Sequence, residues 1–190
     1  MNEARWEMLT LVLGGARSGK SEFAEGLVAA CGERVLYVAT AQGGDDEMID
    51  RIAHHRARRP VTWSTLEAPT GVGNRLMGLD WRPNAVLVDC LSLLVSNLLL
   101  ALLDAGDTLA PSEADVFEKA VISELDRLQQ ASEKLNAPMV VVSNEVGMGL
   151  VPAYPLGRVY RDVLGRSNKR LAALADRVYL VVAGLPLTLK

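Results

Sequence analysis

Cysteine and histidine are scarce in this chain of 190 residues, which has two of each, and aromatic residues make up only 5%. The two cysteines, Cys31 and Cys90, lie far apart, with no Cys-x-x-Cys spacing and no neighbouring histidine to complete a zinc site. This pattern argues against a disulfide framework and against a structural zinc centre. We expect both cysteines to be small buried apolar residues in a reduced cytoplasm.

A large excess of charge of either sign is also absent. Lysine and arginine total 20 and aspartate and glutamate total 23, which gives a net charge of −3. Such a surface does not attract nucleic acid or anionic lipid as a whole, so a polyanion must be bound locally. With 49% hydrophobic and 23% charged residues the composition is globular, and the length predicts one domain spanning residues 1–190.

Only residues 85–103 form an apolar stretch long enough to cross a membrane, and this stretch contains polar residues, among them Asp89. An aspartate in mid-span costs about 2.5 to 3.5 kcal/mol on insertion scales. A buried strand followed by a mostly buried helix explains the stretch without lipid. The apolar run Leu9–Leu13 is too short for the core of a signal peptide, so we expect a cytoplasmic protein without a membrane span.

Short apolar runs alternate with longer helical patterns, and the runs are nearly continuous, as in strands buried on both faces. We expect strands at Leu9–Leu13, Arg34–Ala39, Val61–Ser64, Ala85–Asp89, Met139–Ser143 and Val178–Ala183, and Leu187–Leu189 is a candidate for an edge hairpin strand. The helical patterns cover Lys20–Ala30, Asp46–Arg58, Leu91–Asp104, Ser112–Leu135 and Val159–Ala175. This alternation predicts an α/β fold, with a mostly parallel sheet and helices on both faces.

The strongest local motif follows the first predicted strand and opens the first predicted helix. It matches GxxxxGKS, the phosphate-binding P-loop, in the residues Gly14, Gly15, Ala16, Arg17, Ser18, Gly19, Lys20 and Ser21. In such a loop the backbone N–H groups and the helix N-terminus surround phosphate oxygens, and the lysine neutralises the outer phosphates. The Ser21 hydroxyl is then a candidate ligand of Mg²⁺. We therefore expect a nucleotide-binding protein.

A phosphate-bound Mg²⁺ usually has a second anchor, which in this class is an acidic residue at the end of a neighbouring strand. Asp89, which ends the apolar run AVLVD, is placed for that role. An aspartate capping the helix that begins at Leu91 fits the same position, so both interpretations remain open. Glu67 lies near the same sheet edge, but the residues alone favour an ordinary loop position for it.

The two histidines, His54 and His55, are adjacent and are followed by Arg56, Arg58 and Arg59. A neutral imidazole is a nucleophile or proton carrier at pH 7, and the positive charge beside it suits phosphate. Adjacent residues of a helix point about 100° apart, so at most one of the pair can face a given phosphate. A solvent-exposed amphipathic helix with two surface histidines is the alternative.

A P-loop alone leaves several nucleotide-using classes open. Switch GTPases ordinarily carry an NKxD motif that reads guanine, and the nearest run, Asn168-Lys169-Arg170-Leu171, lacks the aspartate. This argues against a switch GTPase. Small-molecule kinases, nucleotidyl transferases and RecA-like ATPases remain, and composition does not separate them.

Several segments in combination go further than the P-loop. They are GGARSGKS, VLYVATAQ, DDEMIDRIAHHRARRP with Trp63, SNEVGMGLVP and RVYRDVLGRSNKRLAALADRVYLVVAGLPL. Together they resemble the CobU/CobP family, the bifunctional adenosylcobinamide kinases and adenosylcobinamide-phosphate guanylyltransferases of cobalamin biosynthesis. The resemblance covers nearly the whole chain from Leu9 to Lys190.

The resemblance implies a RecA-like P-loop fold, a homotrimer, and two reactions that use GTP and ATP with Mg²⁺. Adenosylcobinamide is first phosphorylated, and its phosphate then receives GMP from GTP, with pyrophosphate released. In the family the second reaction passes through a GMP–histidine intermediate, and the matching histidine here is His54. The further nucleotide-binding positions that the resemblance implies are Thr40, Ala41, Gln42, His55, Arg56, Ala57, Arg58, Glu67 and Asp89.

The sequence departs from the enterobacterial pattern in having Asp89 where some members carry Glu, Gly43 and Gly44, and a longer N-terminal lead. For corrinoid contact the candidates are Trp63, the segment SNEVGMGLVP and the stretch before Arg161, which we expect to be a loop. Two rival functions remain: a plain P-loop small-molecule kinase, which forms no covalent nucleotide, and a RecA-like regulatory NTPase.

Overall fold

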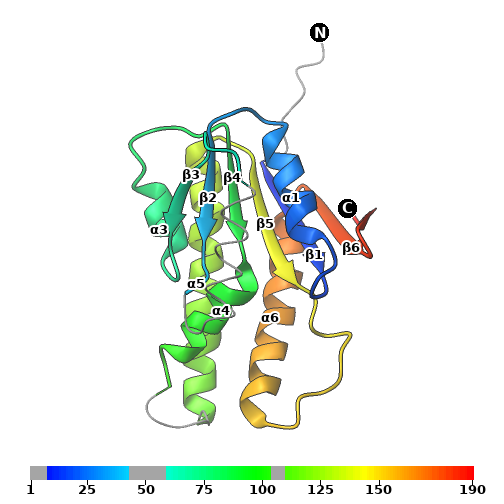
Figure 1. The fold of residues 1–190 in the computed structure, drawn as a ribbon. Helices are drawn as coiled ribbons and strands as arrows, with labels where there is room; N and C mark the ends of the chain where they lie inside the picture. Colours follow the sequence, from blue (N-terminus) through cyan, green and yellow to red (C-terminus); the bar gives the residue numbers. More distant parts are fainter. Residues whose placement is uncertain (1–7, 43–58, 104–109) are drawn as a thin grey trace.

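A seven-stranded sheet organises the chain in the computed structural model, which describes residues 8–42, 59–103 and 110–190 (Figure 1). The strands are β1 (Leu9–Gly14), β2 (Val35–Ala39), β3 (Ser64–Glu67), β4 (Ala85–Asp89), β5 (Met139–Asn144), β6 (Arg177–Val182) and β7 (Leu185–Thr188). The helices are α1 (Lys20–Ala29), α3 (Val72–Met77), α4 (Leu91–Leu100), α5 (Pro111–Leu135) and α6 (Pro155–Leu174).

The strands lie in the order β3-β2-β4-β5-β1-β6-β7, and only the pair β6 and β7 is antiparallel. The parallel strands point the same way in Figure 1, so their carboxyl ends meet at one edge of the sheet. In register, Ala39 pairs with Glu67 on one side and with Asp89 on the other, while Gly14 pairs with Asn144. Ligands of open parallel sheets bind outside this edge.

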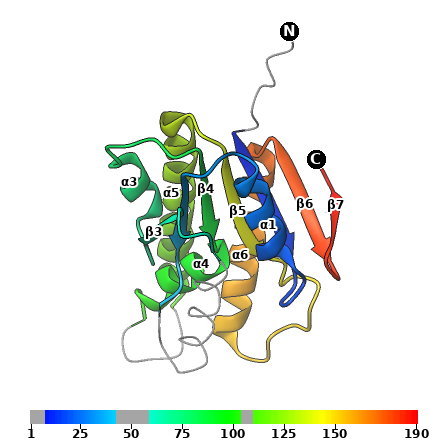
Figure 2. The same ribbon diagram turned by 45° about the horizontal axis from the view of Figure 1, so that its top comes forward.

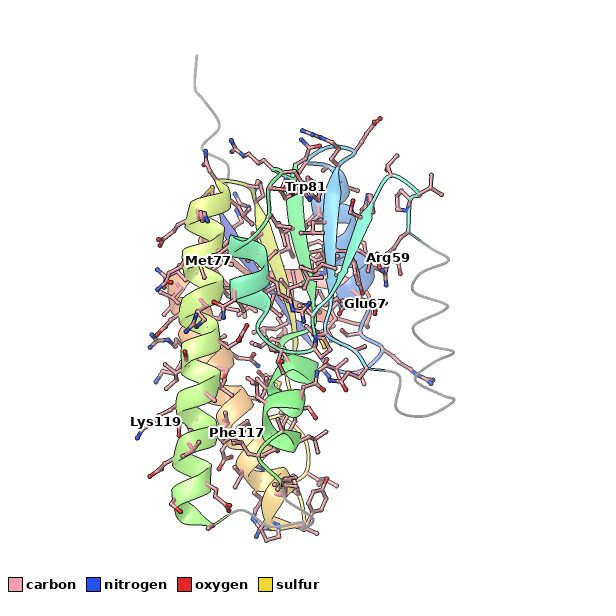
Figure 3. All side chains as sticks on the ribbon, turned by 90° about the vertical axis from the view of Figure 1, so that its left-hand side faces the viewer. Arg59, Glu67, Met77, Trp81, Phe117 and Lys119 are labelled. Carbon is pink, nitrogen blue, oxygen red and sulfur yellow. The ribbon has the colours of Figure 1, made fainter. Side chains whose placement is uncertain are left out.

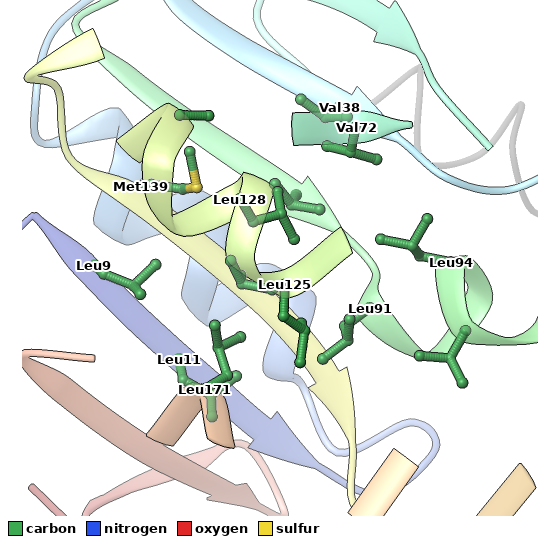
Figure 4. Close-up of a cluster of buried hydrophobic side chains, with 14 of the residues drawn as sticks. Leu9, Leu11, Val38, Val72, Leu91, Leu94, Leu125, Leu128, Met139 and Leu171 are labelled. Atoms are coloured by element: carbon green, nitrogen blue, oxygen red, sulfur yellow. The ribbon is translucent and has the colours of Figure 1, made fainter. Parts of the chain in front are cut away.

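Each central strand is buried on both faces, which explains its nearly continuous apolar sequence. Buried apolar side chains form one cluster on each face of the sheet, and alternate residues of a strand belong to different clusters. In β4, Val86 and Val88 belong to the larger cluster with α3, α4, α5 and α6, whereas Leu87 belongs to the smaller cluster with α1. Figure 4 shows part of the larger cluster, including Leu125 and Leu128 of α5. Figure 2 shows α1 in front of the sheet and the two long helices behind it.

The expected fold class is confirmed, with a mostly parallel sheet, helices on both faces, and the P-loop motif between β1 and α1. The predicted strands that became β1, β2, β4, β5 and β6 agree with the structure to within one residue at each end. The candidate hairpin strand is also present, as β7, although it begins two residues earlier. The predicted helix Asp46–Arg58 lies outside the described residues.

One strand prediction was wrong in position. The strand expected at Val61–Ser64 begins only at Ser64, and Val61 is fully exposed. The Trp63 backbone N–H donates to the Pro60 carbonyl oxygen at 3.0 Å, so the chain turns here and the apolar residue lies in the turn. The edge strand β3 is mostly exposed and polar, and apolar content does not reveal such a strand.

The helix boundaries also needed correction. The fourth helix, α4, ends at Leu100 rather than Asp104, and α6 begins at Pro155 rather than Val159. The stretch before Arg161 is therefore helical and not a loop. The short helix α3 was not expected, because its six residues include Gly73 and Asn74 and are too few to show a periodic pattern.

The stretch 85–103 divides, as expected, into β4 and α4. Among the described residues, no helix is both long and apolar enough to cross a membrane.

Gly73 offers a test of the packing between α3 and α5. A Cβ atom at Gly73 would lie 2.5 Å from the backbone carbonyl carbon of Arg127 in α5. We expect Gly73→Ala to lower the free energy of unfolding by about 1 to 3 kcal/mol, because one of the two helices must shift. Urea unfolding followed by circular dichroism measures the change.

The matched control is Gly165→Ala in the exposed face of α6, where a Cβ atom meets nothing within 4 Å. This replacement should raise the stability by up to about 1 kcal/mol, since glycine is the weaker helix former. Equal effects of the two replacements would contradict the close packing at Gly73.

Candidate functional site

The P-loop joins the buried end of β1 to the start of α1 and follows a backbone path that few residues tolerate. Arg17 has φ 58° and Gly19 has φ 90°, both in the left-handed region. Glycine adopts this conformation without strain, and Arg17 is held there by the loop. The turn between β6 and β7 supports the loop, because the Gly184 N–H donates to the Ser18 carbonyl oxygen at 2.8 Å.

Close packing explains why glycine is required at two points. A Cβ atom at Gly14 would lie 2.4 Å from the Ser18 hydroxyl oxygen and 2.8 Å from the Val181 carbonyl oxygen. A Cβ atom at Gly19 would approach the Gly184 Cα atom to 3.2 Å. The backbone of the loop is therefore fixed from both sides by its neighbours.

Lys20 and Ser18 place buried polar groups in this loop. The Lys20 side chain is buried, and its ammonium Nζ donates to the Gly15 carbonyl oxygen at 3.0 Å. The Ser18 hydroxyl is buried and has no hydrogen-bond partner among the described residues. Buried polar groups normally find partners, so this loop is suited to a polar ligand. The lysine also puts a positive charge where a phosphate-binding loop needs one.

Asp89 and Glu67 lie at the ends of strands on the same edge as the P-loop. The Asp89 carboxylate accepts a hydrogen bond of 2.7 Å from the Tyr37 hydroxyl. Burial, and then the Asp89 charge, raise the pKa of Tyr37 well above its usual range, so this phenol remains a donor. Glu67 is exposed at the end of the edge strand β3.

Thr40 joins the ends of β2 and β4 on the inside of this edge. Its hydroxyl donates to the Cys90 carbonyl oxygen at 2.8 Å and accepts from the Cys90 N–H at 2.7 Å. The Thr40 carbonyl oxygen accepts from the Asn97 side chain at 2.8 Å, and Thr40 is fully buried. These bonds fix the backbone that follows Asp89.

The two bonds between the Thr40 hydroxyl and the Cys90 backbone act as a clamp between β2 and β4. The Cys90 side chain is buried, and this burial, followed by the Asp89 charge, raises the pKa of its thiol. The prediction that both cysteines are buried is therefore confirmed for Cys90 alone, because Cys31 is half-buried near the end of α1. Both are free thiols.

On the other side of the P-loop, α6 supports the end of β5. The Ser143 hydroxyl donates to the Asn168 side-chain oxygen at 2.7 Å, and the Asn168 amide donates to the Asn144 carbonyl oxygen at 3.0 Å. The Glu145 N–H in turn donates to the Gly14 carbonyl oxygen at 3.1 Å. Asn168, whose run Asn168–Leu171 lacks the aspartate of an NKxD motif, thus supports the P-loop framework.

The structure brings most of the described candidates to one sheet edge, because the loop Gly14–Ser21, the segment Thr40–Gln42, Glu67 and Asp89 all follow or end parallel strands. Thr40 is buried and its hydroxyl is hydrogen-bonded to the backbone, whereas Ala41 is half-buried and Gln42 is exposed. Their contact with nucleotide stays a prediction. The remaining candidates, His54, His55, Arg56, Ala57 and Arg58, lie outside the described residues.

Tyr37 was not among the expected site residues, and Arg59 was expected only as positive charge beside the histidines. Tyr37 contacts Asp89, and the Arg59 guanidinium carbon lies 3.3 Å from the centre of the Tyr37 ring. A signal for Tyr37 was present, since residues two apart in a strand share a face and Tyr37 precedes the strand end by two positions. The pairing of β2 with β4 was needed to identify its partner.

The donor set fits a magnesium ion that is shared with phosphates. The oxygen donors Ser21 and Asp89 come from the start of α1 and the end of β4, and α1 packs on the cluster containing Leu87 of β4. Within the described ranges no group of three or more His, Cys, Asp or Glu side chains could hold a metal by itself. Mg²⁺ commonly takes only one or two protein ligands and completes its shell with water and phosphate.

A separate cavity of about 530 Å³ lies between α5 and α6. Its rim includes the ion pairs of Arg166 with Glu118 and of Arg170 with Asp126. Both helices cover the sheet face opposite α1, so this cavity is not part of the site at the P-loop.

Comparison with known proteins finds similarity over nearly the whole chain. A family model described as cobinamide kinase / cobinamide phosphate guanyltransferase matches residues 10–189. The bifunctional adenosylcobalamin biosynthesis protein CobU of Salmonella typhimurium is 45% identical over 186 residues, covering 96% of this chain and 100% of that protein. CobP of Pseudomonas aeruginosa is 44% identical over 183 residues, covering 96% and 98% respectively. The crystal structure of the RadB recombinase aligns with a TM-score of 0.47 at 19% identity, covering 92% of this chain and 74% of that one.

Thr40→Val tests the clamp between β2 and β4. Valine keeps the shape but removes both hydrogen bonds. The buried Cys90 N–H then loses its partner, whereas the Cys90 carbonyl oxygen still accepts from the Leu94 N–H at 3.1 Å. We expect the free energy of unfolding to fall by about 1 to 3 kcal/mol, because one buried N–H group is left unsatisfied. Urea unfolding measures the loss, and Thr40→Ser, which keeps the hydroxyl, should lose markedly less. Similar losses in both variants would mean that the methyl group matters and the hydroxyl does not.

Proposed function

Because the chain belongs to the cobinamide kinase / cobinamide phosphate guanyltransferase family, we propose that it performs both reactions on one domain and passes GMP through a histidine. The family match gives a bifunctional enzyme of cobalamin biosynthesis. The observation that carries the chemistry is the formed P-loop with its buried Lys20. Asp89 and Glu67 lie at the same sheet edge.

The first reaction is the phosphorylation of the aminopropanol hydroxyl of adenosylcobinamide by ATP or GTP. The backbone N–H groups of the loop bind the phosphates, and Lys20 exchanges its bond to the Gly15 carbonyl oxygen for a bond to a phosphate oxygen. Phosphoryl transfer needs positioning and charge neutralisation more than covalent help from the protein. In this proposal the P-loop and Lys20 supply both, and no side chain acts as a dedicated base.

The second reaction uses His54 as the nucleophile. A neutral imidazole nitrogen attacks the α-phosphorus of GTP, the bond between that phosphorus and the bridging oxygen breaks, and pyrophosphate leaves. The phosphate of adenosylcobinamide phosphate then attacks the same phosphorus, which releases the histidine and gives adenosylcobinamide-GDP. Lys20 and the loop N–H groups hold the charge on the leaving pyrophosphate, with Arg56 or Arg58 assisting. His55, Ala57, Thr40, Ala41, Gln42 and Glu67 complete the nucleotide contacts in this proposal.

Ser21 and Asp89 would hold Mg²⁺, which when bound neutralises phosphate charge and orients the phosphates. The aspartate carboxylate is one methylene shorter than the glutamate of some family members. The close bond to Tyr37 shows that this shorter side chain is nevertheless held at the strand end.

For the corrinoid, the described residues favour the segment after β5 over Trp63. Met148 and Leu150 are 81% and 96% exposed in the loop that follows β5 beside the P-loop. An apolar surface of this kind suits a large macrocycle. Trp63 is half-buried and packs against the cluster under α1, which reduces the area that it can offer to a ligand.

The resemblance and the composition also support three further features of this protein. They are Mg²⁺ as the cofactor, a homotrimeric assembly and a cytoplasmic location.

The covalent step predicts a labelled protein. Incubation with GTP labelled at the α-phosphate and Mg²⁺, followed by denaturing electrophoresis, should show acid-labile label on the wild-type chain. His54→Ala should lose the label almost entirely while retaining some kinase turnover, because the phosphoryl transfer does not use that imidazole. The matched variant His55→Ala should still be labelled.

Label retained on His54→Ala and lost from His55→Ala would assign the nucleophile to the neighbouring residue. A wild-type chain that phosphorylates adenosylcobinamide and is never labelled would be a plain kinase. Slow GTP hydrolysis that corrinoids do not affect would instead indicate a regulatory NTPase.

A further inference from the structure

Tyr37 and Asp89 form a hydrogen-bonded pair at the end of neighbouring strands. The phenol oxygen lies 2.7 Å from Asp89 Oδ2, and the Tyr37 side chain is 3% exposed. Within residues 8–42, 59–103 and 110–190, this phenol is the only hydrogen-bond donor found on the Asp89 carboxylate. One carboxylate oxygen thus accepts a hydrogen bond, and the other accepts none from the described residues.

Arg59 stacks on the ring of Tyr37, which packs on the side of the sheet that carries α1. Its guanidinium carbon lies 3.3 Å from the centre of the Tyr37 ring, and its Nη1 donates to the Thr65 hydroxyl at 3.4 Å. Figure 3 shows Arg59 beside β3, away from α5. Stacking of a cation on an aromatic face restrains the ring and shields the phenol from water. The Tyr37 hydroxyl therefore has little freedom to leave Asp89.

We propose that Tyr37 is a positioning residue for Asp89, holding one carboxylate oxygen so that the other is available to the Mg²⁺–nucleotide complex. This inference rests on the proposed function, in which Asp89 is a ligand of that complex. A carboxylate that must serve a ligand at a strand end benefits from preorganisation, because its side chain is otherwise free to rotate away.

The chemistry at position 37 favours positioning over packing alone. Phenylalanine would fill the same apolar space between β2 and α1 without placing a hydroxyl beside a carboxylate. Tyr160 of α6 provides the contrast within the same chain. Tyr160 is half-buried, and its hydroxyl donates to the Ser92 carbonyl oxygen at 3.0 Å. Such a bond to a backbone group orients no carboxylate.

The test compares Tyr37→Phe with the matched variant Tyr160→Phe in the full-length chain. Binding of a fluorescent GTP analogue is measured with Mg²⁺ and again with EDTA. The dissociation constant in EDTA divided by that in Mg²⁺ reports how much the metal contributes to binding. We expect this ratio to fall about three- to tenfold in Tyr37→Phe, because the carboxylate loses its fixed orientation. Tyr160→Phe should keep the wild-type ratio, although each variant loses one part-buried hydrogen bond of a phenol.

Asp89→Asn and the double variant Tyr37→Phe/Asp89→Asn separate the two proposals. If Tyr37 acts through Asp89, the double variant should show the same ratio as Asp89→Asn. A ratio unchanged in Asp89→Asn would overturn the metal role of Asp89 and thereby the proposed function at this residue. A reduced ratio in Asp89→Asn with a wild-type ratio in Tyr37→Phe would overturn the positioning role alone, as would an equal fall in Tyr37→Phe and Tyr160→Phe.

Discussion

The pairing of buried parallel strands is the constraint on which the rest of this structure depends. It places the P-loop, the end of β2 and the carboxylate at the end of β4 along one edge, although these segments lie far apart in the sequence. The two hydrogen bonds between Thr40 and the Cys90 backbone then fix the spacing of β2 and β4 at that edge. A site made from several strand ends needs this spacing before any ligand arrives.

The two faces of the sheet differ in the residues that they bury. The larger apolar cluster joins α3, α4, α5 and α6 to one face and supplies most of the buried apolar surface. The opposite face packs α1, and here apolar strand positions give way toward the carboxyl edge to Tyr37 and Asp89, with Arg59 stacked on the Tyr37 ring. Polar groups in a buried setting are costly unless they bond to one another, and these groups do so. The hydrogen-bonded pair Tyr37 and Asp89 thus lies on the face that carries α1.

The sequence was informative wherever the signal is local. The strands Leu9–Gly14 and Ala85–Asp89 are apolar throughout, and the P-loop motif contains its own strand, turn and helix start. It was less informative for β3, whose exposed polar residues form a strand only because β2 offers an edge, and for α3, whose six residues depend on packing against α5. The roles of Thr40 and Tyr37 depend on which strand lies beside β2, and spacing along the chain does not contain that information. Resemblance to a family supplied the candidates His54 and Glu67, which the residues alone left undecided.

The central claim is that the loop Gly14–Ser21 is preformed to bind the phosphates of GTP, and that the Lys20 ammonium is hydrogen-bonded to the Gly15 carbonyl oxygen before they bind. A crystal structure of the chain with Mg²⁺ and a GTP analogue that cannot be cleaved tests this claim most directly. The account predicts the phosphates within hydrogen-bonding distance of the loop N–H groups, the Lys20 ammonium moved from Gly15 onto a phosphate oxygen, and little change in the loop backbone. Phosphates bound elsewhere, or a lysine that stays on Gly15 while nucleotide is bound, would contradict it.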